Sequence, residues 1–214
     1  MAYWGYIPFI KKHIDTFFKD NANVLEIGLD LGQSFVPMLF YLSKNNPNFS
    51  LIGCDVLVKD SLQAMLVPCS QDLTETQQLA IVTQSSLEFL PELEKQCQEL
   101  NKPLSVAMID GDHNYYTVKK ELEYCSRIMH PQGVILVDDY QGKYAKKDLY
   151  YSDYDTHKHI DGLFDKSQNT SDKQGVGTAV DEFLQENLDW SMLSDPQFEP
   201  CLLYRQEFLD VRKP

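Results

Sequence analysis

The sequence has no excess of basic residues and no long apolar run. Its 19 Lys and Arg residues are outnumbered by 32 Asp and Glu residues, so its formal net charge is −13. A chain of this sign repels phosphates, and we therefore expect neither a nucleic-acid partner nor binding to anionic membranes. No apolar run approaches the roughly 20 residues of a membrane-spanning helix. Residues 1–18 also lack the order of basic, apolar and small residues that is typical of a signal peptide.

Paired cysteines are absent as well. The five cysteines are scattered along the chain, and none of them forms a CxxC pair. Zinc sites and disulfide frameworks need regularly spaced thiols, so neither is expected here. The simplest interpretation is a protein of the reducing cytoplasm.

Short apolar runs alternate with amphipathic segments along the chain. The runs are bounded by Gly, Asp or Asn and are apolar on both faces, as buried parallel strands are. They lie at 23–28, 51–55, 79–83, 104–110 and 133–139. Helical periodicity covers 34–45, 86–100 and 114–129, and 130-HPQG-133 is expected to stop the last of these helices.

This alternation predicts an α/β fold with a doubly wound, mostly parallel seven-stranded sheet and helices on both faces. Residues 188–193 and 199–206 predict two final strands that close the sheet with antiparallel pairing. We expect one domain over residues 1–214, because neither a linker nor an internal repeat divides the chain. Residues 1–20 predict an N-terminal helix that covers part of the fold, and its apolar face would also suit a homodimer.

Residues 141–175 interrupt the alternation with a polar segment rich in Tyr, Asp and Lys. A connection of this length is typical either of a functional lid or of a disordered insertion. Four of its tyrosines could pack against a ring or a sugar as parts of a lid: Tyr144, Tyr150, Tyr151 and Tyr154. Its histidines, His157 and His159, are expected to be solvated.

The first predicted strand leads into a turn with two glycines, 24-VLEIGLDLGQS-34. Gly28 and Gly32 let the backbone approach a ligand, and Ser34 opens a helix whose free N–H groups face the same space. The dinucleotide motif GxGxxG is absent and Asp30 would repel a pyrophosphate, so NAD and FAD fit poorly. A ligand with an amino-acid moiety fits better, and Glu26 could help to anchor either a cationic group or a polar network beneath it.

Acidic residues stand at the ends of three further predicted strands. Asp55 has the position at which an acid commonly binds ribose hydroxyls. Asp110 ends the fourth strand, and Asp138 and Asp139 end the fifth. Neighbouring strands lie about 4.8 Å apart, so these three carboxylates can converge at one edge of the sheet. They repel one another unless a cation joins them, and oxygen ligands without cysteine predict Mg²⁺, Mn²⁺ or Ca²⁺.

A second interpretation of the same residues is purely structural. Acidic side chains after a strand often cap the following helix. In 107-AMIDGDHNYY-116, Asp112 has that position relative to a helix that begins near Asn114. Spacing alone leaves both the metal site and the helix cap open.

Taken together, LEIGLDLGQS, IGCD, IDGDHNYYTVKKEL and VILVDDY resemble the class I S-adenosylmethionine-dependent methyltransferases. Within these, the sequence is most similar to the metal-dependent O-methyltransferases of the catechol, caffeoyl-coenzyme A and macrocin types. The resemblance covers about residues 22–140, and residues 175–184 are similar to the helix that follows the fifth strand. It implies a Rossmann-like methyltransferase fold with S-adenosylmethionine as cofactor.

The resemblance also implies a role for each candidate residue. The methionine end of the cofactor would be lined by Glu26, Gly28, Gly32 and Ser34. Asp55 would hold its ribose, Ser86 would lie beside its adenine, and Asp110 would also contact it. The metal would be held by Asp110, Asp138 and Asp139. His113 stands where catechol-type enzymes have a catalytic Lys, and a histidine can accept a hydroxyl proton near neutral pH. Asp112 is the competing base.

The sequence therefore predicts an S-adenosylmethionine-dependent O-methyltransferase assisted by a divalent cation, Mg²⁺ or else Mn²⁺ or Ca²⁺. Its substrate would be a small molecule with a catechol-like, phenolic or sugar hydroxyl. The alternatives are a metal-independent N- or carboxyl-methyltransferase of the same fold and a non-catalytic protein that binds S-adenosylmethionine.

Overall fold

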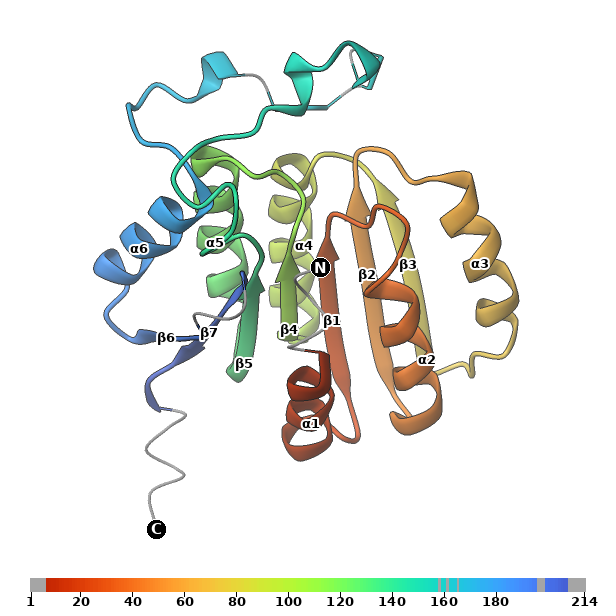
Figure 1. The fold of residues 1–214 in the computed structure, drawn as a ribbon. Helices are drawn as coiled ribbons and strands as arrows, with labels where there is room; N and C mark the ends of the chain where they lie inside the picture. Colours follow the sequence, from red (N-terminus) through yellow and green to blue (C-terminus); the bar gives the residue numbers. More distant parts are fainter. Residues whose placement is uncertain (1–6, 158, 161, 165, 196–198, 208–214) are drawn as a thin grey trace.

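The structure is a computed structural model, and it describes residues 7–157, 159–160, 162–164, 166–195 and 199–207. Seven strands form one sheet in the order β3-β2-β1-β4-β5-β7-β6 (Figure 1). The strands are β1 (Ala22–Ile27), β2 (Phe49–Asp55), β3 (Gln77–Thr83), β4 (Leu104–Ile109), β5 (Met129–Val137), β6 (Trp190–Ser194) and β7 (Cys201–Arg205). The α-helices are α1 (Ile7–Phe17), α2 (Phe35–Asn45), α3 (Asp60–Gln71), α4 (Ser86–Leu100), α5 (Tyr115–Ile128) and α6 (Val176–Glu186).

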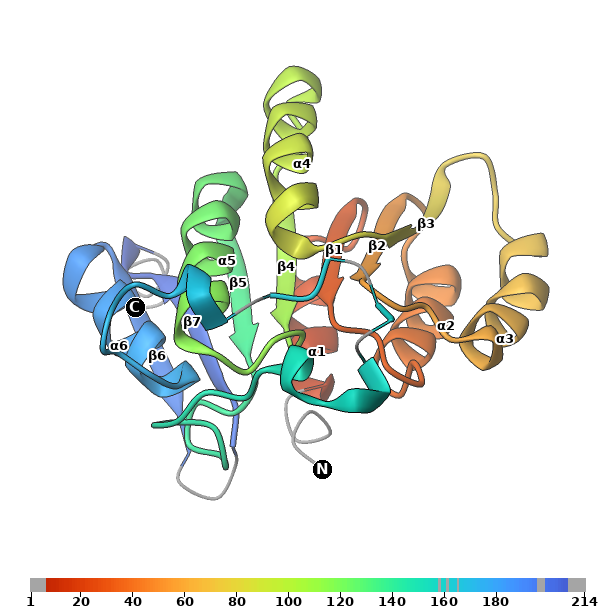
Figure 2. The same cartoon turned by 90° about the horizontal axis from the view of Figure 1, so that it is seen from above.

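A hydrophobic layer covers each face of the sheet. Successive side chains of a strand point to opposite faces, so Leu25 of β1 packs with α4, α5 and α6, while Val24 packs with α1, α2 and α3. Figure 2 shows these two sets of helices on opposite sides of the sheet. Ile10 and Ile14 of α1 are fully buried, so this helix covers the chain's own sheet. No described helix is both long enough and apolar enough to span a bilayer, and this includes α4, the longest of them.

The predicted fold class is confirmed. Strands β1 to β5 pair in parallel, and β7 runs antiparallel to both β5 and β6. From β1 the chain moves outward through β2 to β3, then returns to place β4 on the other side of β1. Ligands of such sheets bind at this reversal, outside the carboxyl ends of the strands. The fold therefore directs attention to the ends of β1 and β4.

Two elements differ from the prediction. The sequence pattern does not reveal α3, because only Leu62 and Leu66 of this helix are buried and Pro68 lies inside it. Residues 130–133 were expected to separate a helix from a strand, but β5 begins at Met129, directly after α5. The register of β5 on β4 shifts between Leu104 and Val106, and this irregularity accommodates the additional residues of β5.

Residues 141–175, which we call the arm, connect β5 to α6 and pass over the carboxyl edge of the sheet (Figures 1 and 2). Their described part contains the short 3-10 helices η2 (Tyr151–Asp153), η3 (Asp155–His157) and η4 (Lys166–Gln168). Asp148 ties the arm to both neighbouring helices, because its Oδ1 accepts hydrogen bonds from the N–H groups of Tyr115 (2.8 Å) and Gly175 (2.7 Å). The arm is thus anchored at the start of α5 and of α6.

We predict that Gly28→Ala destabilises the fold far more than Gly162→Ala. Both glycines have a positive φ, +84° and +82°, which costs an alanine about 1–2 kcal/mol. A Cβ on Gly28 would also lie 2.1 Å from the carbonyl oxygen of Asp110, whereas the nearest atom to a Cβ on Gly162 is 3.5 Å away. Urea unfolding should give a loss of about 3 kcal/mol or more for Gly28→Ala. Equal losses in the two variants would contradict a close approach of β1 to the end of β4.

Candidate active site

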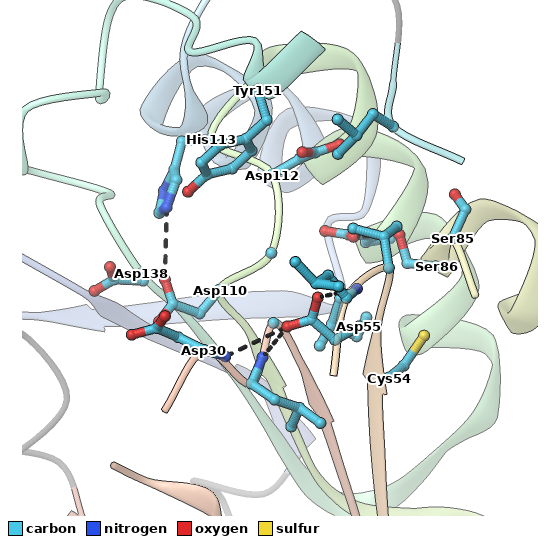
Figure 3. Close-up of a pocket in the computed structure, with 18 of the residues that line it drawn as sticks. Asp30, Cys54, Asp55, Ser85, Ser86, Asp110, Asp112, His113, Asp138 and Tyr151 are labelled. Atoms are coloured by element: carbon cyan, nitrogen blue, oxygen red, sulfur yellow. Dashed lines mark hydrogen bonds and ion pairs between the residues drawn. The ribbon is translucent and has the colours of Figure 1, made fainter. Parts of the chain in front are cut away.

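A cavity of about 550 Å³ lies at the carboxyl edge of the sheet, beneath the arm (Figure 3). Most of the predicted site residues line it: Gly28, Ser34, Asp55, Ser86, Asp110, Asp112, His113, Asp138 and Asp139. Two others, Glu26 and Gly32, do not. Glu26 is buried behind Ser34, and Gly32 packs so closely on α3 that an added Cβ would lie 2.4 Å from Leu62.

Asp55 holds the turn after β1 against the end of β2. Its Oδ2 accepts hydrogen bonds from the N–H groups of Leu29 (2.7 Å) and Asp30 (3.3 Å), and its Oδ1 accepts one from Leu57 (2.9 Å). Asp30 itself has a positive φ of 42° and forms an ion pair with Lys59. Besides the ribose contact that the sequence predicts, Asp55 thus has a structural role that its sequence position does not reveal.

Glu26 is fully buried and accepts a hydrogen bond from the Ser34 hydroxyl. Burial raises the pKa of Glu26 from 4.5 to about 8, although the Ser34 hydrogen bond opposes this shift. Its Oε2 has no hydrogen-bond partner among the described residues. At neutral pH Glu26 is therefore a neutral acid, and it must lose its proton before it can anchor a cationic group by charge.

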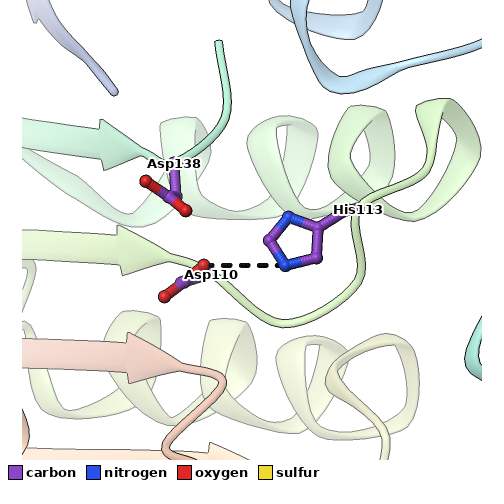
Figure 4. A group of neighbouring side chains, drawn as sticks. All are labelled: Asp110, His113 and Asp138. Atoms are coloured by element: carbon purple, nitrogen blue, oxygen red, sulfur yellow. Dashed lines mark ion pairs between the residues drawn. The ribbon is translucent and has the colours of Figure 1, made fainter. Parts of the chain in front are cut away.

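Asp110 and Asp138 each follow directly after a strand, and the sheet's hydrogen-bond ladder positions them. The Asp110 N–H donates to Ile27 O (2.9 Å), and the Asp138 N–H donates to Ile109 O (3.0 Å). One ligand atom from each carboxyl group and one ring nitrogen of His113 lie within 4.8 Å of one another (Figure 4). The predicted convergence of the two strand ends is present, with His113 beside it.

These groups suit a divalent cation. Burial and the neighbouring carboxyl group of Asp138 raise the pKa of Asp110 well above its usual range, and burial likewise raises the pKa of Asp138. The Oδ1 atom of Asp138 is buried without a hydrogen-bond partner among the described residues. Two close carboxylates share a proton or a cation, and carboxylate oxygen ligands suit Mg²⁺, Mn²⁺ or Ca²⁺.

Asp139 was predicted as a third metal ligand, and it lies against His113. Its Oδ2 is 3.1 Å from Nδ1 of His113, while Nε2 of the same ring is 3.8 Å from Oδ1 of Asp110. Asp139 has a positive φ of 55°, a conformation that turns the chain sharply after β5. A carboxylate on one ring nitrogen fixes the orientation of the imidazole and favours a proton on that nitrogen.

Asp112 does not cap α5 in the way that one interpretation of the sequence suggested. Asn114 is the cap, since its side-chain oxygen accepts a hydrogen bond from the Thr117 N–H (2.9 Å). Asp112 Oδ2 accepts a hydrogen bond from the Thr117 hydroxyl (3.2 Å). Burial raises the pKa of Asp112 to about 6. Asp112 therefore lies in the cavity wall with one oxygen already engaged.

Ser86 faces a partner that the sequence analysis missed. Its hydroxyl donates to Oε1 of Glu121 (2.6 Å), a fully buried residue of α5 that lines the cavity. The signal was present in the sequence, because position 121 lies three residues after Val118 and next to Leu122, on the buried side of α5. Glu121 is the one acid among the buried residues of α5, and a fully buried glutamate indicates a specific role.

The arm contributes aromatic side chains to the cavity, but fewer than predicted. Tyr144 and Tyr151 line it, with ring centroids 5.3 Å and 6.3 Å from that of His113. Tyr150 is buried against Phe164 instead. The exposed Tyr154 lies outside the cavity lining, which includes His157 but not His159.

Comparison with known proteins gives one family and a set of structures. The model of a family described as a methyltransferase domain matches residues 25–140. No curated protein matches the sequence significantly. Among solved structures, CalS11, described as a TDP-rhamnose 3'-O-methyltransferase of calicheamicin biosynthesis, is 13% identical with a TM-score of 0.60. The match covers 93% of this chain and 78% of CalS11.

Two further structures have the same fold. MycE from the mycinamycin pathway, solved with Mg, SAH and mycinamycin VI, is 14% identical with a TM-score of 0.55, and the match covers 94% of this chain. This chain spans about half of MycE, 49% of its length. The O-methyltransferase TomG from Streptomyces achromogenes, solved with SAM, is 14% identical with a TM-score of 0.52 over 92% of this chain and 79% of its own. At these identities the likeness shows the fold alone.

The buried Glu26 should make stability depend on pH. Its folded pKa of about 8 lies above the unfolded value of 4.5, so the folded state holds a proton that the unfolded state lacks between these values. Stability is therefore lost as the pH rises from about 5 towards 8, at up to about 1.4 kcal/mol per pH unit for this group. We predict that Glu26→Gln flattens this slope in urea unfolding. Glu92→Gln, at an exposed position of α4, should leave the slope unchanged. An unchanged slope in Glu26→Gln would show that Glu26 is ionised in the folded state.

Proposed function

The chain belongs to the methyltransferase domain family, and from this premise we propose that it is an S-adenosylmethionine-dependent O-methyltransferase of a small molecule, assisted by a divalent cation. The observation that carries the proposal is the convergence of Asp110, Asp138 and His113 at the reversal of the strand order. A base and a cation site beside the glycine turn after β1 suit methylation of a hydroxyl group, because both help to remove its proton.

S-adenosylmethionine, when bound, supplies an electrophilic methyl group on a sulfonium. The turn after β1 approaches the cavity at Gly28, and Asp55 holds that turn by its backbone N–H groups. Ser34, bonded to Glu26, lines the same part of the cavity. TomG and MycE, which share this fold, bind SAM and SAH in their solved structures, and this supports the same cofactor here.

A divalent cation would be held by Asp110 and Asp138, with Asp139 as a further ligand, and when bound it would orient an acceptor hydroxyl and lower its pKa. The unpartnered Asp138 Oδ1 supports this proposal. So does the Mg in the MycE structure, which shares the fold. Because cations and protons compete for the same oxygens, a bound cation would also displace the protons that burial favours on these two carboxyl groups.

His113 is the better placed of the two candidate bases. Asp139 lies 3.1 Å from its Nδ1, so the other nitrogen, Nε2, is left to accept the proton of a hydroxyl group. Asp112 has one oxygen engaged by Thr117. Tyr144 and Tyr151 lie beside His113 and can exclude water from the reacting groups or pack against a ring or sugar of the acceptor.

We predict that methyl transfer depends on a divalent cation. Activity towards catechol-like and sugar acceptors should be lost in EDTA and restored by excess Mg²⁺. Asp138→Asn should remove most of the activity even when Mg²⁺ is in excess. Asp153→Asn, in the arm and outside the cavity lining, is the matched control. Full activity in EDTA would instead show that methyl transfer to these hydroxyl groups needs no cation, and it would remove the metal from the proposal.

The two candidate bases can be separated by substitution. We expect His113→Gln to lower kcat by about 10²- to 10⁴-fold with little change in cofactor affinity, because it removes the proton acceptor. Asp112→Asn should lower kcat by less than about tenfold, since its amide still accepts from Thr117. Single-turnover rates measured at saturating cofactor distinguish these effects from binding. The opposite ranking of the two variants would identify Asp112 as the base.

A further inference from the structure

Glu121 is a buried acid that neither the glycine turn nor the acidic cluster uses. It is fully buried in α5 and lines the cavity. Its Oε1 is occupied by the Ser86 hydroxyl at 2.6 Å, while Oε2 has no hydrogen-bond partner among the described residues. A polar atom that is buried without a partner costs free energy, so its retention in a cavity wall indicates a partner supplied by a ligand.

The position of Glu121 along the cavity indicates which part of a ligand it meets. Oε1 lies near the turn after β4, since a Cβ added to Gly111 would be 3.9 Å from it. Glu121 also contacts the start of α4, where Ser86 donates its hydrogen bond. The start of α4 lies next to the end of β2, because the Gln84 N–H donates to the backbone oxygen of Asp55. The acidic cluster with His113 lies towards the ends of β4 and β5. Glu121 therefore borders the end of the cavity that lies between the end of β2 and the start of α4.

The chemistry of that end suits a flat heteroaromatic ring. Apolar side chains from the segment after β2 and from the arm lie beside the start of α4: Val56, Leu57 and Ile160. Ser86 and Glu121 provide polar atoms in the same region. Apolar walls can hold the faces of a ring, and a single precisely placed polar group can read its edge.

We propose that Glu121 Oε2 hydrogen-bonds the edge of the cofactor's adenine and is the residue that selects this base, with Ser86 holding the carboxyl group in place. This inference rests on the proposed function, and it adds a specificity-determining residue to it. Burial raises the pKa of Glu121 to about 8, so near neutral pH the group is a carboxylic acid. With Oε1 accepting from Ser86, the acid proton on Oε2 can be donated to a ring nitrogen of adenine.

The test is a cycle of variants and ligands, measured as binding of S-adenosylhomocysteine by calorimetry. The ligands are S-adenosylhomocysteine and its 1-deaza, 3-deaza and 7-deaza analogues, each of which replaces one ring nitrogen by CH. The variants are Glu121→Gln, which keeps a donor and an acceptor, and Glu121→Met, which keeps the length without either. Glu123→Met, two residues along α5 and paired with Lys120 outside the cavity, is the matched control.

We expect wild type to bind one of the three analogues roughly tenfold or more weakly than S-adenosylhomocysteine, because the donated hydrogen bond is lost. Glu121→Met should bind S-adenosylhomocysteine more weakly by a similar factor and no longer distinguish that analogue. Glu121→Gln should retain most of the affinity and the discrimination, and Glu123→Met should behave as wild type. This rescue by the amide is not expected of a residue that only packs α5 against α4.

Two failures can be told apart. If wild type does not bind S-adenosylhomocysteine at all, the proposed function is wrong, and the role of Glu121 with it. If wild type binds S-adenosylhomocysteine but all three analogues equally well, the role of Glu121 alone is overturned. Discrimination that persists in Glu121→Met also overturns the role of Glu121, and if that variant fails to fold, as judged by thermal unfolding without ligand, Glu121→Leu takes its place in the cycle.

Discussion

Burying carboxyl groups without balancing charges costs free energy, and the cavity at the carboxyl edge of the sheet does this repeatedly. Among the described residues, eight acidic side chains line it and only two lysines do. The protein offsets this imbalance in different ways at different positions. Backbone N–H groups satisfy Asp55, the ring of His113 satisfies Asp139, and the carboxyl groups of Asp110 and Glu121 keep their protons more tightly than usual. The remaining negative charge matches the positive charge of the proposed cofactor and of a divalent cation.

The same imbalance connects stability with ligand binding. Protons and cations compete for the oxygens of the buried carboxyl groups. Either one stabilises the folded protein when it binds, and the binding of one weakens the binding of the other. Asp110 and Asp138 lie directly after strands whose backbone hydrogen bonds continue through them, so they cannot relieve their repulsion by moving apart. The rigid sheet therefore holds the two carboxyl groups close together, although no positive charge of the protein balances them fully.

Much of this arrangement could be predicted from the sequence, because it follows from the parallel sheet. Runs of apolar residues indicate strands, and acids after those strands must share one edge, so the sequence alone assigns Asp55, Asp110 and Asp138 to the same edge. Contacts between elements distant in the chain could not be predicted in this way. Glu121 meets Ser86 across 35 positions, and Asp139, which has a positive φ, meets His113 across 26 positions. Helix α3 has too few buried residues to produce a clear local pattern. The early start of β5 depends on its pairing with β4, which the local sequence does not show.

The attachment of the arm limits what a change in its sequence can alter. Asp148 fastens the arm to the first residue of α5 and to Gly175 before α6, so the segment begins and ends on parts of the fold that the sheet already fixes. Between these anchors, the described part of the arm lines the cavity with Tyr151, His157, Ile160, Gly162 and Leu163. The acidic cluster and the glycine turn lie at the ends of the strands, whereas the arm supplies aromatic and apolar walls of the same cavity. Substitutions in this one connection would therefore reshape the cavity and leave the strand ends in place.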